Sequence, residues 1–181
     1  MKKNGPWTIK GSDLKYRNPW IELREDQVVR PDGTEGVYGV VTQKPGISVL
    51  ALDDDGFVYV VEEFRYALER NSLETVSGAI DEGEDSLDAA KRELKEETGI
   101  TAHDWHSFGW LDPLSSTVRC PQHLYLARKL MFGIRKPDDN ELIEVRKLKF
   151  TDVVQLVLDN KITYGPSCVL ILKANEYLKV R

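Results

Sequence analysis

Short apolar runs separated by turn-forming residues mark out much of the chain. Runs of about four to eight such residues, bounded by Gly, Pro or Asp, are typical of strands. One boundary, the Asp-Asp-Asp-Gly sequence at residues 53–56, predicts a β-hairpin turn. We predict strands at residues 36–41, 47–52, 57–61, 73–76, 105–111, 123–130 and 145–150.

The clearest helical pattern lies at residues 86–98. Leucine and alanine recur there at positions that share one face of a helix. Asp85 or Ser86 can cap the first turn, and Gly99 is typical of the position just beyond a helix end. This segment is therefore the best-defined helix of the chain.

Two more helices are predicted near the end of the sequence. Residues 151–158 carry an apolar stripe, with the hydroxyl of Thr151 as the expected cap. Residues 166–178 begin with a proline, which the first turn of a helix tolerates. The order of strands, helix, strands and helices favours an α+β fold with a mixed sheet over a doubly wound parallel sheet.

The N-terminal part reads as a separate β element. Residues 10–30 hold strand-like apolar positions, with turn signals at residues 18–19 and 30–33. We therefore expect a β-hairpin arm at residues 1–38, followed by the main domain at residues 39–181.

Composition narrows the class of protein. The chain has 181 residues, of which 41% are hydrophobic and 30% charged, as in ordinary globular proteins. A net charge of −5 argues against a nucleic-acid partner. No apolar run can span a membrane, and no signal peptide is evident at the start. Two cysteines, Cys120 and Cys168, fit reduced thiols in a cytoplasmic protein.

Acidic residues crowd the helix at residues 86–98. Glu93, Glu96 and Glu97 share one face, where they repel one another and oppose the helix dipole. A divalent cation would remove both penalties, and carboxylate oxygens favour Mg²⁺ or Mn²⁺ over zinc. The alternative is a solvated acidic face whose carboxylates pair with neighbouring lysines and Arg92.

The surrounding pattern favours the metal site. Gly78, Glu84, Arg92 and the residues up to Ile100 fill every specified position of the Nudix box, G-x5-E-x7-R-E-U-x-E-E-x-G-U, where U is a bulky aliphatic residue. From about Gly39 onward the chain therefore resembles a Nudix hydrolase. The resemblance implies a mixed β-sheet sandwiched between helices and metal-dependent hydrolysis of a diphosphate linkage.

The resemblance also implies roles for residues at matching positions. Glu93, Glu97 and the backbone carbonyl of Ser77 would bind Mg²⁺, for which Mn²⁺ could substitute. Glu96 would be a catalytic carboxylate, as a further ligand or an orienting group. Glu84 matches a structural or weakly metal-linked position.

Segments outside the box resemble the ADP-ribose pyrophosphatase group, which acts on nucleoside diphosphate sugars. Residues 60–66 match a segment whose arginine reaches the substrate phosphates, and Arg65 holds that position. The alternative is a surface arginine paired with Glu62 or Glu63. Residues 73–78 parallel the entry to the box in that group. The expected products are a nucleoside monophosphate and a sugar phosphate.

Two further candidates come from the same resemblance. The group places an acidic loop where this chain has residues 138–145, and Glu141 matches its catalytic carboxylate, with Asp139 and Glu144 as rivals. A base that arrives with the substrate avoids idle activation of water. In that group the arm is exchanged between the two subunits of a homodimer, so the arm here is expected to take part in dimerisation. Trp20 in the arm could stack on the substrate base in the partner's site, or could pack in the dimer core.

Two other functions stay open on the sequence. A related substrate such as GDP-mannose or a dinucleotide would keep the same chemistry. A non-catalytic nucleotide sensor or DNA-binding regulator is disfavoured, because such proteins usually lose the box glutamates, which are intact here.

Overall fold

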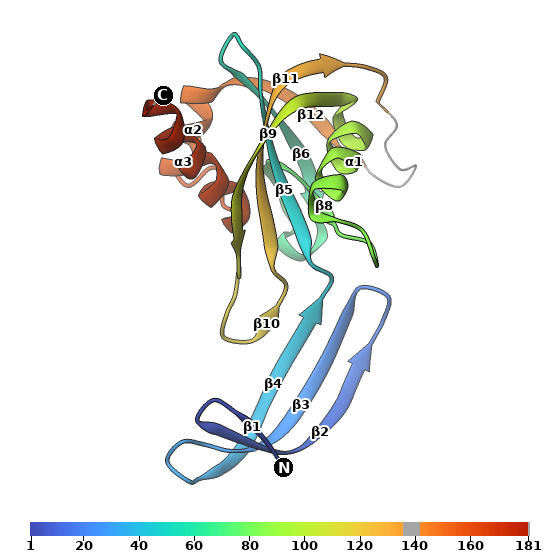
Figure 1. Ribbon diagram of the computed structural model, residues 1–181, viewed down its shortest axis with the longest axis vertical. Helices are drawn as coiled ribbons and strands as arrows, with labels where there is room; N and C mark the ends of the chain where they lie inside the picture. The colour runs from blue at the N-terminus through green and yellow to red at the C-terminus, as the bar shows by residue number, and fades with distance from the viewer. Residues whose placement is uncertain (136–141, 181) are drawn as a thin grey trace. The chain divides into compact units, whose positions relative to one another are not determined.

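The computed structural model describes residues 1–135 and 142–180. The chain forms two compact units (Figure 1). Unit 1 comprises residues 1–44 and 112–121, and unit 2 comprises residues 45–111 and 122–181. Within the described segments, no helix is both long enough and apolar enough to cross a membrane.

Unit 2 is built on a mixed β-sheet. Strands β5 (Gly46–Leu52) and β11 (Gln122–Phe132) run parallel, and the other neighbours are antiparallel, so the predicted α+β class is confirmed. The predicted strand at residues 73–76 is instead two strands, because the chain turns at Thr75 and passes from pairing with β6 (Phe57–Arg65) to pairing with β5. The sheet order is β12 (Glu144–Lys149), β6 (Phe57–Arg65), β5 (Gly46–Leu52), β11 (Gln122–Phe132) and β9 (Ile100–Leu111), with β7 (Arg70–Glu74) on β6 and β8 (Val76–Ala79) on β5.

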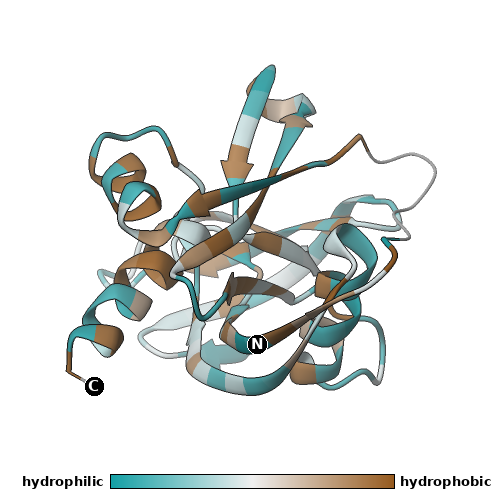
Figure 2. Ribbon diagram, turned by 90° about the horizontal axis from the view of Figure 1, so that it is seen from above, coloured by the Kyte–Doolittle hydropathy of each residue, from teal (hydrophilic) through white to brown (hydrophobic). Residues whose placement is uncertain are grey.

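Alternation along β5 explains why helices cover both faces of this sheet. Ile47 and Val49 pack in the core beneath α1 (Ser86–Thr98). Leu50 and Leu52 point the opposite way, toward α2 (Phe150–Leu158) and α3 (Gly165–Lys179). Figure 1 shows α1 on one face and the other two helices on the opposite face, and Figure 2 shows alternating apolar and polar segments along the strands.

The helix ends follow the local sequence in two of three cases. The Asp85 carboxylate accepts a hydrogen bond from the Leu87 backbone and caps α1, and Gly99 ends it with a positive φ of 73°. The third helix begins at Gly165 with a proline in its first turn, as expected. The predicted cap of α2 by Thr151 is wrong, because the helix begins one residue earlier, with Lys149 in the cap position and no side-chain cap.

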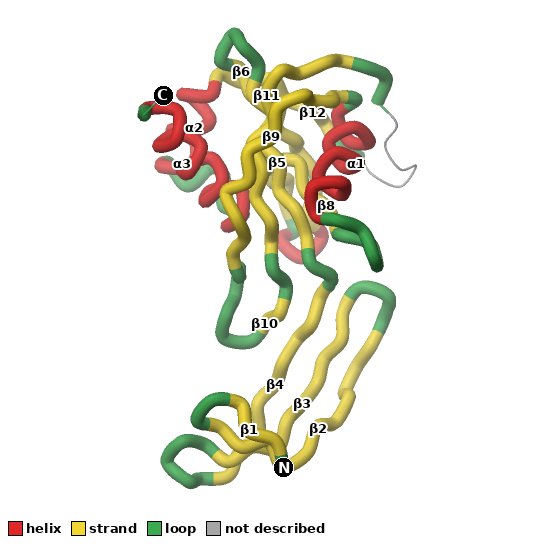
Figure 3. Tube along the Cα trace, viewed as in Figure 1, coloured by secondary structure: helices red, strands yellow, loops and turns green. Residues whose placement is uncertain are grey.

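Unit 1 consists of strands, as Figure 3 shows, and confirms the expected N-terminal β arm. It is larger than a hairpin. The antiparallel meander is extended by a two-residue strand at residues 118–119, which pairs in parallel with β4 (Glu35–Gln43). The strand order is β1 (Lys2–Asn4), β2 (Trp7–Arg17), β3 (Ile21–Val29), β4 (Glu35–Gln43) and β10 (Val118–Arg119).

Candidate active site

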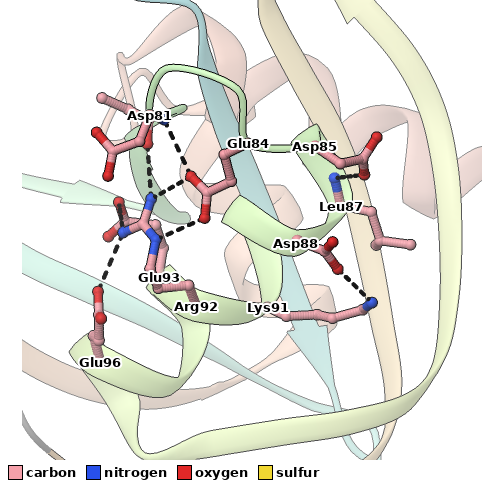
Figure 4. A network of polar contacts seen from close by, with 10 residues as sticks. Asp81, Glu84, Asp85, Leu87, Asp88, Lys91, Arg92, Glu93 and Glu96 are labelled. Carbon is pink, nitrogen blue, oxygen red and sulfur yellow. Dashed lines mark hydrogen bonds and ion pairs between the residues drawn. The ribbon is translucent and has the colours of Figure 1, made fainter.

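Arg92 is the centre of the polar network on α1 (Figure 4). Its Nε and Nη2 each donate to one carboxylate oxygen of Glu84, both at 2.9 Å. Its Nη1 donates to Glu93 at 2.8 Å and to Glu96 at 3.2 Å. Its Nη2 also reaches the backbone carbonyl of Ala79 at 3.0 Å. One guanidinium therefore ties the helix to the preceding loop and to the end of β8.

Glu84 is held as a structural anion. The Arg92 hydrogen bonds, helped by the backbone N–H of Asp81 at 3.1 Å, lower the pKa of Glu84 from its ordinary 4.5 to about 2. Gly83 makes the preceding turn possible with a φ of 80°, a conformation that few other residues adopt. The paired charges also raise the pKa of the Arg92 guanidinium, which stays charged at any physiological pH.

Glu93 lies directly against the backbone of Gly78. A Cβ atom at position 78 would lie 2.1 Å from both Cδ and Oε1 of Glu93, which is far inside van der Waals contact. The box glycine therefore provides the space in which this carboxylate sits. The neighbouring residue, Ser77, is in β8, and its backbone carbonyl belongs to the same short strand.

The three helix glutamates have different environments. Glu97 is only 6% exposed and faces inward with Ala90 and Leu94. The Glu96 side chain is 47% exposed and the Glu93 side chain 15%. No three His, Cys, Asp or Glu side chains among residues 1–135 and 142–180 already form a metal-binding group. In this arrangement the cation that links Glu93 and Glu96 is the Arg92 guanidinium.

The donor set nevertheless fits a hard divalent cation. Carboxylates at 93 and 97 and the carbonyl at 77 are all oxygen donors, which Mg²⁺ and Mn²⁺ prefer. Because Gly78 has no side chain, the Glu93 carboxylate has room beside β8, the strand that carries Ser77. Glu93 and Glu97 hold the box positions to which the family resemblance assigns metal binding, and Ser77 directly precedes the box.

Arg65 sits in a carboxylate clamp at the end of β6. Its Nε and Nη2 donate to Glu74 at 3.2 and 2.7 Å, and its Nη1 lies 2.7 Å from Glu63. Glu74 is 3% exposed, so a buried carboxylate fixes the orientation of the Arg65 guanidinium. The contact with Glu63 agrees with the surface-pair alternative. The sequence did not predict the contact between Arg65 and Glu74 on β7, although Glu74 lies in the segment that resembles the entry to the Nudix box.

The next residues along the chain anchor this region to α3. The Thr75 backbone N–H donates to Ser167 Oγ at 2.9 Å, and the two hydroxyls share a second hydrogen bond at 2.9 Å. Both residues are fully buried. This contact fixes the turn between the strand that holds Glu74 and the strand that holds Ser77.

Four candidates remain: Glu141, Asp139, Glu144 and Trp20. Glu141 and Asp139 lie outside the described residues. Glu144 is described, is 67% exposed and contacts Arg146 at 3.2 Å. Trp20 belongs to unit 1, where the side chain of Asn18 holds the turn before β3 and the indole is 72% exposed.

Fold and box helix together define a Nudix domain. Residues 42–166 match the NUDIX domain family, and residues 7–41 match the nucleoside diphosphate sugar hydrolase N-terminal domain. The chain therefore belongs to the Nudix hydrolases, and the resemblance seen in the sequence is confirmed. Nudix hydrolases generally use divalent metal ions and act on nucleoside diphosphate compounds.

Individual relatives agree with this assignment. The chain is 30% identical over 170 residues to an ADP-ribose pyrophosphatase of Bacillus subtilis (strain 168), covering 89% of this chain and 86% of that one. It is 27% identical over 160 residues to a methanol dehydrogenase activator of Bacillus methanolicus, covering 87% and 81%. A crystal structure of an ADP compounds hydrolase superimposes with a TM-score of 0.84 at 22% identity, covering 99% and 97%, which confirms the Nudix fold.

Proposed function

We propose that this Nudix hydrolase cleaves the diphosphate linkage of nucleoside diphosphate sugars such as ADP-ribose, giving a nucleoside monophosphate and a sugar phosphate. The observation that carries the proposal is the Glu93 carboxylate seated against Gly78, beside the buried Glu97 on the same helix. The match of residues 7–41 to the nucleoside diphosphate sugar hydrolase N-terminal domain supports the substrate class.

The metal that suits these donors is Mg²⁺, with Mn²⁺ as a substitute. Glu93, Glu97 and the carbonyl of Ser77 would hold it, and Glu96 would complete or orient the set. When bound, such an ion neutralises phosphate charge and lowers the pKa of a bound water. Hydrogen bonds from Arg92 to Glu93 and Glu96 hold both carboxylates close to the helix surface.

Arg65 is the proposed phosphate-binding side chain. Its contacts with Glu74 and Glu63 use three of the five N–H groups that a guanidinium carries. The side chain is 34% exposed, so the remaining donors can meet a phosphate oxygen from solvent. The buried Glu74 fixes the plane of the guanidinium, which favours a directional contact over a diffuse one.

Glu141 remains the proposed general base, and Trp20 the proposed partner of the substrate base. Both assignments depend on the family resemblance. The proposed homodimer also depends on that resemblance, and Trp20, Phe64 and Tyr66, which are 72%, 55% and 90% exposed, are available to such an interface. Size-exclusion chromatography with light scattering measures the oligomeric state, and a monomer at micromolar concentration would contradict the dimer.

The decisive experiment incubates the protein with ADP-ribose and Mg²⁺ and measures AMP and ribose 5-phosphate. Glu97→Gln should lower kcat by about three orders of magnitude, because it weakens the site for the ion that supplies the nucleophile and the charge stabilisation. Asp88→Asn is the matched control, since Asp88 is an exposed acid on the same helix that pairs with Lys91. It should leave kcat unchanged.

A panel of ADP-ribose, GDP-mannose, a dinucleotide and a nucleoside triphosphate, ranked by kcat/KM, tests the substrate class. ADP-ribose or another nucleoside diphosphate sugar should lead the ranking. Absence of AMP, or equal kcat in Glu97→Gln and Asp88→Asn, would refute the proposed reaction. Preference for a nucleoside triphosphate would refute the substrate class alone.

A further inference from the structure

Unit 1 contains two adjoining cavities whose lining side chains all come from unit 1. One has a volume of about 360 Å³, and its lining includes Trp7 and Tyr38, whose rings meet edge to face at 5.5 Å. The other has a volume of about 430 Å³ and is lined by β1, β2, β3 and Arg119. We call the second cavity the basic pocket, because four cationic side chains line it and no acidic side chain does: Lys2, Lys10, Arg24 and Arg119.

Arg24 is the fixed element of the basic pocket. Its Nε and Nη2 donate to the two carboxylate oxygens of Asp26 at 2.8 and 3.1 Å. Asp26 is 4% exposed and also accepts a hydrogen bond from Ser12 Oγ at 2.6 Å. The two hydrogen bonds to Asp26 orient the Arg24 guanidinium and use two of its five N–H groups. Arg24 can therefore offer the other three to a ligand.

The Asp26 carboxylate stays ionised despite its burial. Burial acts to raise its pKa, but the hydrogen bonds from Ser12 and Arg24 outweigh it and the net shift is downward. The buried pair is therefore a permanent part of the fold, and it presents a preformed guanidinium to the pocket.

The basic pocket has more cationic side chains than acidic partners for them. Lys10 pairs with Glu35 at 2.6 Å and Arg24 pairs with Asp26, so two of the four cations have acidic partners. Lys2 and Arg119 form no ion pair with a residue in the described part of the chain. Two positive charges are thus left over. A phosphate monoester carries about −1.5 to −2 charges near pH 7, which matches this excess.

We propose that the basic pocket binds the phosphate group of a small phosphomonoester. Arg24 and Arg119 supply guanidinium donors, Lys2 supplies charge, and the Ser12 hydroxyl lies at the same wall. Whatever the phosphate carries extends into the adjoining cavity, because the two cavities share Asn4, Ile9, Arg24 and Arg119. The neighbouring cavity offers the aromatic rings of Trp7 and Tyr38 to that group. None of these side chains belongs to the α1 cluster.

The test is a titration of the whole protein by NMR at low ionic strength, observing the arginine Nε–H signals. Inorganic phosphate, ribose 5-phosphate and AMP are the three probes. None contains a diphosphate linkage, so the outcome does not depend on the proposed hydrolysis. At least one probe should shift the Arg24 and Arg119 signals with saturation, and the probe that binds most tightly identifies the source of the phosphate.

Arg119→Ala should raise the dissociation constant at least ~10-fold, the expected loss for a hydrogen bond to a charged group. Lys2→Ala is the second variant and should weaken binding in the same direction. Arg17→Ala is the matched control, because Arg17 is an exposed arginine of the same unit that pairs with Glu22 and does not line the pocket. Chloride at equal ionic strength should produce no saturating shift.

Three results would overturn the proposal. The first is the absence of saturable shifts with all three probes. The second is an equal loss of affinity in Arg17→Ala and Arg119→Ala, which would show a general charge effect. The third is a set of shifts confined to the signals of Arg92 and its neighbours on α1.

Discussion

Replacement of Gly78 by alanine tests the geometry of the α1 site most directly. The added methyl group would lie 2.1 Å from Cδ and Oε1 of Glu93, whereas ordinary van der Waals contact begins at 3.4 Å. The carboxylate must therefore move by roughly 1 Å, and a displacement of about 1 Å at a reacting centre can cost ~100-fold in rate. The move would also disturb the 2.8 Å contact between Glu93 and Arg92.

Fold stability should suffer far less than catalysis. The atoms that the methyl group meets are the end of a flexible side chain, and Gly78 has no positive φ that would exclude alanine. We expect kcat/KM for ADP-ribose with Mg²⁺ to fall about 100-fold. Thermal unfolding followed by circular dichroism should show a shift of only a few degrees, since about 1 kcal/mol shifts Tm by ~2–4 °C at this chain length.

Gly165→Ala is the control for this substitution. A Cβ atom at position 165 meets nothing within 4 Å, and the residue opens α3. This variant should keep full activity. The reasoning fails if Gly78→Ala retains kcat/KM within about threefold of the wild type while remaining folded, because Glu93 would then tolerate displacement.

Two further substitutions probe the supporting structure. The folded-state pKa of Glu84 is about 2 against an ordinary 4.5, so its ionised form stabilises the fold above pH 4.5 and this stabilisation is lost as the pH falls toward 2. Glu84→Gln should therefore lower Tm at neutral pH, and its Tm should decline less steeply below pH 4.5 than that of the wild type. If the two declines were parallel, the Glu84–Arg92 pair would not be the cause of the acid destabilisation. Ser167→Ala leaves the buried Thr75 groups without their partner and should cost about 1–3 kcal/mol in urea unfolding. Ser107→Ala is the control, at an exposed position of β9 where the hydroxyl accepts one hydrogen bond from the Gly109 backbone N–H. It should cost only about 0.5 kcal/mol, because water can replace that bond, and an equal loss in the two variants would contradict the anchoring role of Ser167.

The local features of the α1 site could be predicted from the sequence because they depend on helical periodicity and chain neighbours. Asp85 and Gly99 mark the helix ends in the sequence and end it in the structure. The eight-residue spacing of Glu84 and Arg92 brings the loop back onto the helix, so their pairing also follows from the box. The failure of Thr151 as a cap has a local origin too, since Phe150 enters the first turn and moves the cap position to Lys149.

Partners from distant strands could not be predicted in the same way. The sequence offers Glu62 and Glu63 as neighbouring partners for Arg65, but the buried carboxylate that holds it is Glu74, nine residues away on β7. The pairing of β10 with β4 likewise joins residues 118–119 to a strand more than seventy positions earlier. Strand register decides such contacts, and a register depends on the packing of the whole sheet.

The family, the acidic helix, its boundaries and the spacing of its carboxylates can be read from the sequence, because helical geometry places residues three and four apart on one face. The folded structure was needed to show that Glu97 is buried while Glu96 is half exposed, and that Gly78 makes room for Glu93. It also assembled the basic pocket, from Lys2 and Lys10 at one end of the chain and Arg119 far along it. Burial and long-range contacts arise from the packing of α1 on the sheet and of β10 on the arm, which no local pattern contains.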